Sequence, residues 1–431
     1  MSGTVKTQAS LLAGVPTGGP AGGILPGNIE DIIATMSSLT QGALTPEMYG
    51  AKGNGTTDDS AAFNSCFAAA LTAGAPVVFG AKTYALANPI HVGTAGGTAE
   101  QNPIPRISGA GFGDGVGIGT VLKAITGLTG TVFTAQNVVE MILQDFVIEC
   151  NNIAATGLDT TWQVTGQTGP SVNNIYENIQ IRNYTSVGWI AGENNDCSFN
   201  HILMDSPSNT TANALRIIAP NGSLMFSDCV FQQLHPNCGV IINSQDAYFI
   251  NCNMTGITIP SGSQNSHTSF HGGYIYSPSN TGITFNIQSG AVVTSIGLFG
   301  THVENNTAWN SGTGAGCIFG GTGALWAGGV LMQPDINITV GGTPCKLVST
   351  ALGTGYGASQ KARIIVMGGE ESNNPVDWSS TSNFDVCTMN VWRNSTGLPI
   401  PDNWVFKGLP TSASGLPTGA IWNSSGALHI V

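Results

Sequence analysis

The sequence contains few charged residues, an odd number of cysteines and no long apolar segment. Asp, Glu, Lys and Arg make up 8% of its 431 residues, against about 25% in typical soluble proteins. Only 12 residues are Lys or Arg and the net charge is −12, which disfavours a nucleic-acid partner because such a protein presents a basic surface. No apolar run approaches the ~20 residues of a membrane span, and the N-terminus lacks the basic start and apolar core of a signal peptide. We therefore expect neither membrane insertion nor a secretion signal.

The nine cysteines include no Cys-x-x-Cys pair, which is the usual unit of zinc and redox sites. Cys229 and Cys252 occupy equivalent positions of the repeat described next, where other copies have Ile or Phe. Buried thiols that act as small apolar side chains are favoured here over disulfide or metal chemistry. The sequence therefore predicts no metal site and no cofactor, and it indicates synthesis in a reducing cytoplasm.

A short phrase recurs along the chain. Phe226-Ser-Asp-Cys-Val-Phe231 is followed 23 residues on by Phe249-Ile-Asn-Cys-Asn-Met254. Further copies start at 143, 176, 199, 270, 298 and 326, with a poorer one near 365–371. A constant short strand at unequal spacing is typical of a solenoid with loops of variable length at one corner. The sequence predicts an all-β fold, a parallel β-helix over residues 46–395.

The opening of this region contains a second recognisable motif. In Met48-Tyr-Gly-Ala-Lys-Gly-Asn-Gly-Thr-Thr-Asp-Asp-Ser-Ala-Ala-Phe63, Asp58 or Asp59 is expected to cap a helix, followed by strands at 77–79 and 83–86. Together with the strand pair over 78–84 and the glycine-rich turn over 109–122, this run resembles the start of the pectate-lyase-superfamily right-handed β-helix of phage tailspike and tail fibre proteins. The resemblance implies an N-terminal cap and first coils in residues 46–123. It also makes Asp58 and Asp59 structural rather than catalytic.

Both ends of the chain resemble phage tail proteins as well. Residues 11–33 resemble virion-attachment segments, and apolar residues at helical spacing predict a short helix from residue 28 to 36. Residues 408–431 resemble the β-rich ending of phage structural proteins, with a hairpin expected from strands at 420–423 and 427–431. The resemblance implies that residues 1–45 attach to a phage tail or adaptor protein and that 396–431 form a C-terminal cap or trimerisation segment. It further implies a homotrimer in the virion tail, made in the host cytoplasm.

The repeat predicts which side chains face outward in columns. The seventh position of the phrase gives Glu149, Arg182, Asp205, Gln232, Thr255, Tyr276, Glu304, Met332 and, at the poorer copy, Glu371. Successive coils of such a fold are about 4.8 Å apart. The stack of Glu149, Arg182 and Asp205 is interpreted as a surface ion ladder rather than a site.

Aromatic and acidic residues gather further along these columns. Tyr274, Tyr276, His271 and Trp309 are predicted to bind sugar, because aromatic rings pack on the apolar faces of sugars. Glu304 and His302 are predicted to act in catalysis, and Glu304 also lies in a strand end that resembles one common in the spike family. A second carboxyl two coils away lies at the ~9.5 Å limit for inverting glycosidases. Glu371 or Asp335 is therefore the predicted partner of Glu304.

These features predict a phage tailspike that recognises and hydrolyses a host surface polysaccharide, such as lipopolysaccharide O-antigen, capsule or exopolysaccharide. Lyase chemistry is disfavoured because the basic residues are scattered and no Asp cluster indicates a calcium site. The charge of −12 suits a neutral polysaccharide better than a polyanion. A spike of the same fold that only binds its receptor or braces the tail stays open as an alternative. A cellular pectate lyase is disfavoured by the phage-like ends of the chain.

Overall fold

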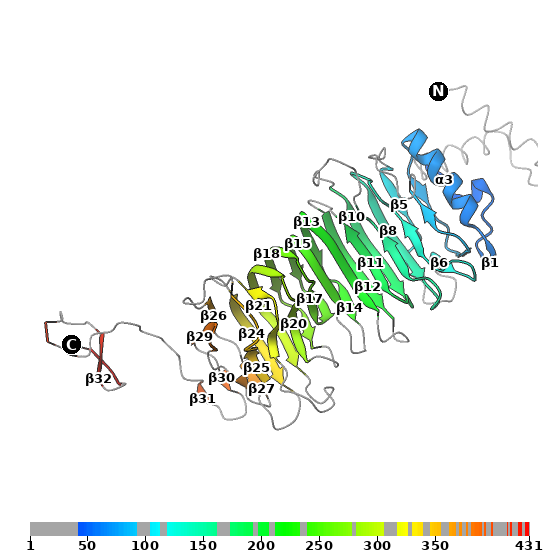
Figure 1. The fold of residues 1–431 in the computed structure, drawn as a ribbon. Helices are drawn as coiled ribbons and strands as arrows, with labels where there is room; N and C mark the ends of the chain where they lie inside the picture. The colour runs from blue at the N-terminus through cyan, green and yellow to red at the C-terminus, as the bar shows by residue number, and fades with distance from the viewer. Residues whose placement is uncertain are drawn as a thin grey trace, which may run out of the picture.

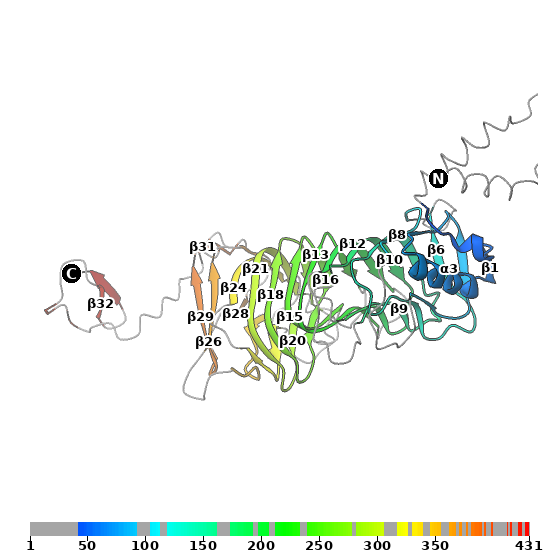
Figure 2. The same ribbon diagram turned by 90° about the horizontal axis from the view of Figure 1, so that it is seen from above.

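The computed structural model describes residues 42–92, 104–112, 119–161, 173–192, 197–206, 212–232, 239–277, 282–305, 317–325, 330–338, 345–354, 362–367, 370–372, 376–377, 381–389, 392–393, 398–399, 412, 414–415, 421–424 and 427–430. This part is nearly all β, with one α-helix (Figure 1). The strands form an elongated stack in which the chain advances from one end to the other (Figures 1 and 2).

The N-terminal end of the stack is covered by a helical cap (Figure 1). It consists of the 3-10 helix η1 (Pro46–Tyr49), β1 (Asn54–Asp58) and α3 (Ser60–Ala73), whose Phe63 and Phe67 are fully buried. The Asp59 carboxylate accepts hydrogen bonds from the Lys52 and Gly53 amides at 2.6 and 3.0 Å. Asp58 accepts bonds from the Ser60 and Ala87 amides, each at 3.0 Å. The predicted helix is confirmed, and both carboxylates hold backbone in place.

Beyond the cap, the chain passes in turn through three sets of parallel strands, and each circuit of all three is called a coil. The first set contains β2 (Val77–Val78), β5 (Arg106–Ser108), β8 (Ile142–Glu149), β10 (Ile175–Arg182), β12 (Cys197–Asp205), the end of β13 (Asn213–Ser227), the end of β15 (Val240–Ile250), β18 (Gln264–His271), β21 (Val292–Asn305), β24 (Val330–Ile338), β26 (Ala362–Met367) and β29 (Phe384–Met389). We call it the first sheet.

The second sheet follows the first after a corner. It contains β3 (Thr83–Leu86), β6 (Val121–Ala124), the ends of β8, β10, β12, β21 and β24, and β14 (Val230–Gln232), β16 (Asn253–Thr255), β19 (Tyr274–Tyr276), β27 (Glu370–Ser372) and β30 (Trp392–Arg393). The third sheet contains β4 (Ile90–His91), β7 (Thr131–Thr134), β9 (Thr156–Asp159), β11 (Val187–Gly192), the starts of β13 and β15, and β17 (Ile257–Ile259), β20 (Ile283–Ile287), β22 (Cys317–Gly321), β25 (Cys345–Val348) and β28 (Val376–Asp377). β23 (Ala324–Leu325) pairs with the start of β21.

The observed register confirms most copies of the repeated phrase. Phe226 pairs with Phe249, and Phe249 pairs with Phe270. Their rings stack inside the molecule with centroids 5.0 Å apart and interplanar angles of 10° and 6°. Cys229 and Cys252 are buried beside this stack, as predicted. The first position of the phrase therefore builds the core of the stack.

The third position of the phrase forms the corner between the first two sheets. Its residues have left-handed backbone, with φ between 52° and 66°: Asp145, Asn178, His201, Asp228 and Asn251. Asn and Asp tolerate this conformation better than other residues with a side chain. Their side chains also bond from coil to coil, since the Asn178 amide donates to Asp145 Oδ1 and the Asn251 amide to Asp228 Oδ1, each at 2.6 Å. The shared Asp or Asn of the phrase is thus a corner residue.

The predicted copy at Trp326 is wrong. Leu298 pairs with Met332 rather than with residue 326, and the register shifts between Phe299 and His302. On β24 only Pro334 separates the partners of Phe299 and His302, where β21 has two residues, Gly300 and Thr301. Proline fixes φ near −65°, so this corner lacks the left-handed residue and no longer matches the phrase.

Two predictions concern the ends of the chain. The C-terminal hairpin is confirmed, with β32 (Ile421–Ser424) and β33 (Ala427–Ile430) antiparallel. β31 (Leu398–Pro399) pairs antiparallel with β30. The helix predicted at 28–36 lies outside the described residues.

Candidate functional site

The second sheet places four of the predicted residues on two neighbouring coils. Tyr274 and Tyr276 lie on β19, and their register partners are His302 and Glu304 at the end of β21. The preceding coil places Asn253 and Thr255 in line with the two tyrosines. The column read from the seventh position of the phrase is therefore correct from Thr255 to Glu304, and Asn253, Tyr274 and His302 form a second column beside it.

The four side chains form one contiguous, half-buried cluster. The Tyr274 ring lies 4.1 Å, between centroids, from both the Tyr276 ring and the His302 ring. The Tyr274 hydroxyl donates a hydrogen bond to Glu304 Oε2. The arrangement presents two phenol rings, an imidazole and a carboxylate on one outward face. A sugar-binding site combines such groups, because aromatic rings pack on the apolar face of the sugar while polar groups bind its hydroxyls.

A tight glycine corner sets the position of Tyr274. Gly273 has φ of 73°, and a Cβ there would lie 2.2 Å from the Cys252 carbonyl oxygen. Only glycine fits so close to the neighbouring coil. The corner separates His271 from the cluster, since His271 lies on the first sheet, where its ring stacks on Phe299 at 4.8 Å. Of the predicted sugar-binding residues, Trp309 lies outside the described residues.

Asp335 and Glu371, the two carboxyl partners predicted for Glu304, do not pair with the residues that the sequence led us to expect. Glu304 pairs with Asn337, and Asn337 pairs with Ser372, so neither Met332 nor Glu371 stands in its column. Asp335 pairs with His302, one coil on, and Glu371 pairs with Ile336. The side chains of Asp335 and Glu371 lie outside what the structure describes. By backbone position, Asp335 is the nearer of the two to Glu304.

Several coils away, the predicted ion ladder forms in part, as an ion pair between Glu149 and Arg182. Arg182 pairs in register with Glu149 on one side and Asp205 on the other. Arg182 Nε lies 2.6 Å from Glu149 Oε2, and the Asn183 amide donates to Glu149 Oε1 at 2.9 Å. These bonds tie neighbouring coils together, which supports the structural interpretation.

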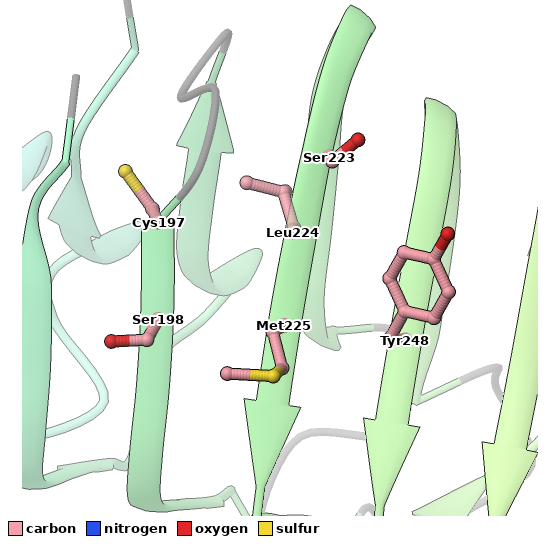
Figure 3. A pocket seen from close by; sticks show the side chains of 6 residues that line it. All are labelled: Cys197, Ser198, Ser223, Leu224, Met225 and Tyr248. Carbon is pink, nitrogen blue, oxygen red and sulfur yellow. The ribbon is translucent and has the colours of Figure 1, made fainter. Parts of the chain in front are cut away.

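Sequence reasoning missed a second outward column, on the first sheet. Ser223, Asp246, His267 and Ser295 follow one another on four successive coils. Each lies three residues before a copy of the phrase, so reading the columns backward from the phrase as well as forward would have found them. Ser223 also lines a hollow of about 250 Å³, together with Cys197, Ser198, Leu224, Met225 and Tyr248 (Figure 3).

The described residues contain no group of three or more His, Cys, Asp or Glu residues arranged to hold a metal ion. No helix among them is both long and apolar enough to cross a membrane.

Comparisons with known proteins identify the fold. No protein-family model matches the sequence, and no curated protein is significantly similar to it. Tailspike protein 2 of Escherichia coli O157:H7 bacteriophage CAB120 is 13% identical with a TM-score of 0.51, over 83% of this chain and 47% of that one. The chain has the fold of a phage tailspike. The resemblance seen in the sequence is thus confirmed at the level of the fold, and the chain spans about half of the tailspike's length.

Weaker similarities extend to other proteins. ORF18 of Geobacillus virus E2 is 13% identical with a TM-score of 0.45, over 85% of this chain and 64% of that one. The catalytic unit of a GH87 α-1,3-glucanase from Streptomyces thermodiastaticus is 15% identical with a TM-score of 0.41, over 84% and 66%.

Proposed function

We propose that this protein is a tailspike component of a phage tail that binds a host surface polysaccharide and hydrolyses it during adsorption. In this proposal the stacked coils are a right-handed β-helix of the pectate-lyase type, three chains form a homotrimer, and residues 1–45 attach the spike to the tail. The polysaccharide belongs to the lipopolysaccharide O-antigen, the capsule or an exopolysaccharide.

The observation that carries the proposal is the cluster of Tyr274, Tyr276, His302 and Glu304. It places a carboxylate among three adjacent rings on the outward face of a protein with 8% charged residues. The net charge of −12 favours a neutral glycan, since a polyanion would be repelled.

Register favours Asp335 as the second carboxyl. Coils lie about 4.8 Å apart and two residues along a strand span about 6.6 Å, so the backbone positions of Glu304 and Asp335 are about 8 Å apart. Glu371 is two coils on, and its backbone position lies about 10 Å from Glu304. Inverting glycosidases hold their carboxyls about 6.5–9.5 Å apart. We assign an inverting hydrolysis to Glu304 and Asp335; His302 is the register partner of Asp335 and lies two residues before Glu304 on the same strand.

The hydrogen bond from Tyr274 holds the Glu304 carboxylate in place on the outward face. We assign to Glu304 the role of the general base, which removes a proton from the attacking water, and to Asp335 the role of the acid, which protonates the leaving glycosidic oxygen. The water oxygen bonds to the anomeric carbon as the glycosidic bond breaks.

The first prediction tests the catalytic role. Purified capsular polysaccharides, O-antigens and exopolysaccharides from a panel of bacteria are incubated with the full-length protein, and new reducing ends and unsaturated-sugar absorbance are measured. We expect reducing ends without unsaturated sugar, and a 10²–10⁴-fold lower rate for Glu304→Gln, as for other lost general bases.

Glu177→Gln is the matched control, because Glu177 is an exposed carboxylate on β10 of the first sheet; its rate should equal that of the unmodified protein. Unsaturated sugar products would show that the enzyme is a lyase and not a hydrolase. If the protein neither binds nor cleaves any glycan of the panel, the whole proposal is contradicted.

A second candidate function is binding without cleavage. It is favoured by the same Tyr274–Glu304 hydrogen bond, because a carboxylate held by a phenol also serves as a fixed acceptor for sugar hydroxyls. In that case glycans from the panel bind, no reducing ends appear, and Glu304→Gln weakens binding.

A further inference from the structure

The hollow on the first sheet lies apart from the Glu304 cluster. Its side chains come from β12, β13 and β15, and Met225 lies between Ser198 and Tyr248 (Figure 3). Met225 is 43% exposed, which makes it one of the few large apolar side chains that the described residues leave open to solvent. An exposed thioether beside an outward phenol ring forms a small apolar platform.

A line of polar groups runs along the edge of this platform. The Ser223 hydroxyl donates to Asp246 Oδ2 at 3.3 Å, and His267 Nδ1 lies 2.6 Å from the Ser295 hydroxyl oxygen. The His267 ring also lies 5.7 Å from the Tyr248 ring. Successive coils thus present a hydroxyl, a carboxylate, an imidazole and a hydroxyl at intervals of about 4.8 Å.

We propose that this hollow is a second sugar-binding subsite that holds a single neutral pyranose ring. The C–H face of the ring lies on Tyr248 and Met225, and its hydroxyls bond to Asp246 and His267. The proposal rests on the proposed glycan-binding function and adds a site that does not include Glu304.

Size and charge define the occupant. Pockets for drug-sized ligands measure about 300–1,000 Å³, so about 250 Å³ suits one ring rather than an oligosaccharide. Neither the hollow nor the polar line contains a Lys or Arg, while Asp246 supplies a carboxylate. An acidic sugar is therefore disfavoured by repulsion, whereas a neutral sugar gains strong hydrogen bonds to the charged acceptor.

The subsite and the Glu304 cluster face outward on neighbouring sheets that are joined by β18 and its glycine corner. From His267 to Tyr276 the chain advances nine residues, at most about 30 Å. One polysaccharide chain is long enough to reach both, so the subsite would hold the glycan while the cluster cleaves it.

The test uses saturation-transfer NMR on the full-length protein with glucose, galactose, mannose, rhamnose, N-acetylglucosamine and glucuronic acid. The background variant carries Tyr276→Ala and Glu304→Gln, which removes the first site. We expect a signal from at least one neutral sugar, none from glucuronic acid, and a loss of more than fivefold when Tyr248→Ala is added. Met225→Glu provides a second variant, because its exposed position tolerates the change while the new carboxylate fills the hollow.

No signal from any neutral sugar in the background variant would overturn the proposal. An unchanged signal in folded Tyr248→Ala or Met225→Glu protein would overturn it too. Failure of the polysaccharide cleavage assay with these signals intact would remove only the catalytic function of the Glu304 cluster.

Discussion

At the scale of single residues, the molecule depends on side chains that stabilise left-handed corners. Asn178 has a left-handed backbone with φ of 56°. Its side-chain amide nitrogen donates to Asp145 Oδ1 at 2.6 Å, and its Oδ1 lies 2.9 Å from His201 Nδ1. One amide therefore links three successive coils while it occupies a conformation that most residues avoid. The same position is glycine at 272 and 300, where the corner needs only backbone freedom.

This dual role predicts the order of two substitutions. Asn178→Ala loses both side-chain bonds and keeps the left-handed backbone, which disfavours alanine by about 1–2 kcal/mol. Asn178→Gly loses the same bonds without that strain, so we expect the glycine variant to be more stable than the alanine variant by about 1 kcal/mol. Urea denaturation measures the difference, with Glu177→Ala as the neighbouring control. A glycine variant less stable than the alanine variant would show that the strain is negligible.

At the scale of an element, the N-terminal cap depends on its acidic pair. Burial by itself would raise the pKa of Asp58, but hydrogen bonds from the Ser60 hydroxyl and the backbone outweigh it and hold the pKa below its usual value of 3.8. The folded-state pKa is therefore lower than the unfolded one. The stabilisation is fully present above the unfolded pKa and is lost as the pH falls through the folded pKa.

The cap should accordingly loosen in acid before the rest of the stack. We expect Asp58→Asn to destabilise α3 by about 1 kcal/mol at pH 7, and we expect this difference to shrink as the pH falls below 3.8, the usual pKa of the group. Hydrogen exchange of the α3 amides measures it, with the β13 amides as internal reference. If the difference in α3 stability between the two proteins is as large at pH 3 as at pH 7, the Asp58 side chain stabilises the cap through packing and not through its charge.

The elements also show what could be predicted from the sequence and what could not. Copies from Leu143 to Leu298 were placed correctly, because inward apolar residues and a left-handed corner recur together. The copy at Trp326 was misplaced for two reasons. Pro334 shortens the corner of the true copy, and the six residues that start at Trp326 happen to match the pattern of the phrase. A shift in register moves side chains to other columns and faces, and for this reason Met332 and Glu371 fall outside the column of Glu304. The Ser223–Ser295 column was missed because it lies before the corner.

At the scale of the whole molecule, the C-terminal hairpin bears on assembly. In the part of the chain that the structure describes, β32 and β33 pair only with each other. A lone two-stranded hairpin is marginally stable in water, so we propose that it packs against copies of the same chain.

A homotrimer should have three times the 44.2 kDa mass of the chain. Light scattering coupled to gel filtration measures this mass on the full-length protein. A chain ending at residue 395 is the control, and we expect it to be monomeric. A mass of 44.2 kDa for the full chain would contradict the trimer.

The alignment of the hydrogen bonds has a mechanical consequence. Bonds between parallel strands of successive coils run along the length of the stack, and each coil contains 21 to 34 residues between equivalent positions from Leu143 to Met332. A force that pulls the two ends apart would break the bonds of one coil at a time, and each step would release one coil of slack chain. A force across the stack would instead be shared by many coils, so the molecule should resist sideways loads far better than lengthwise tension.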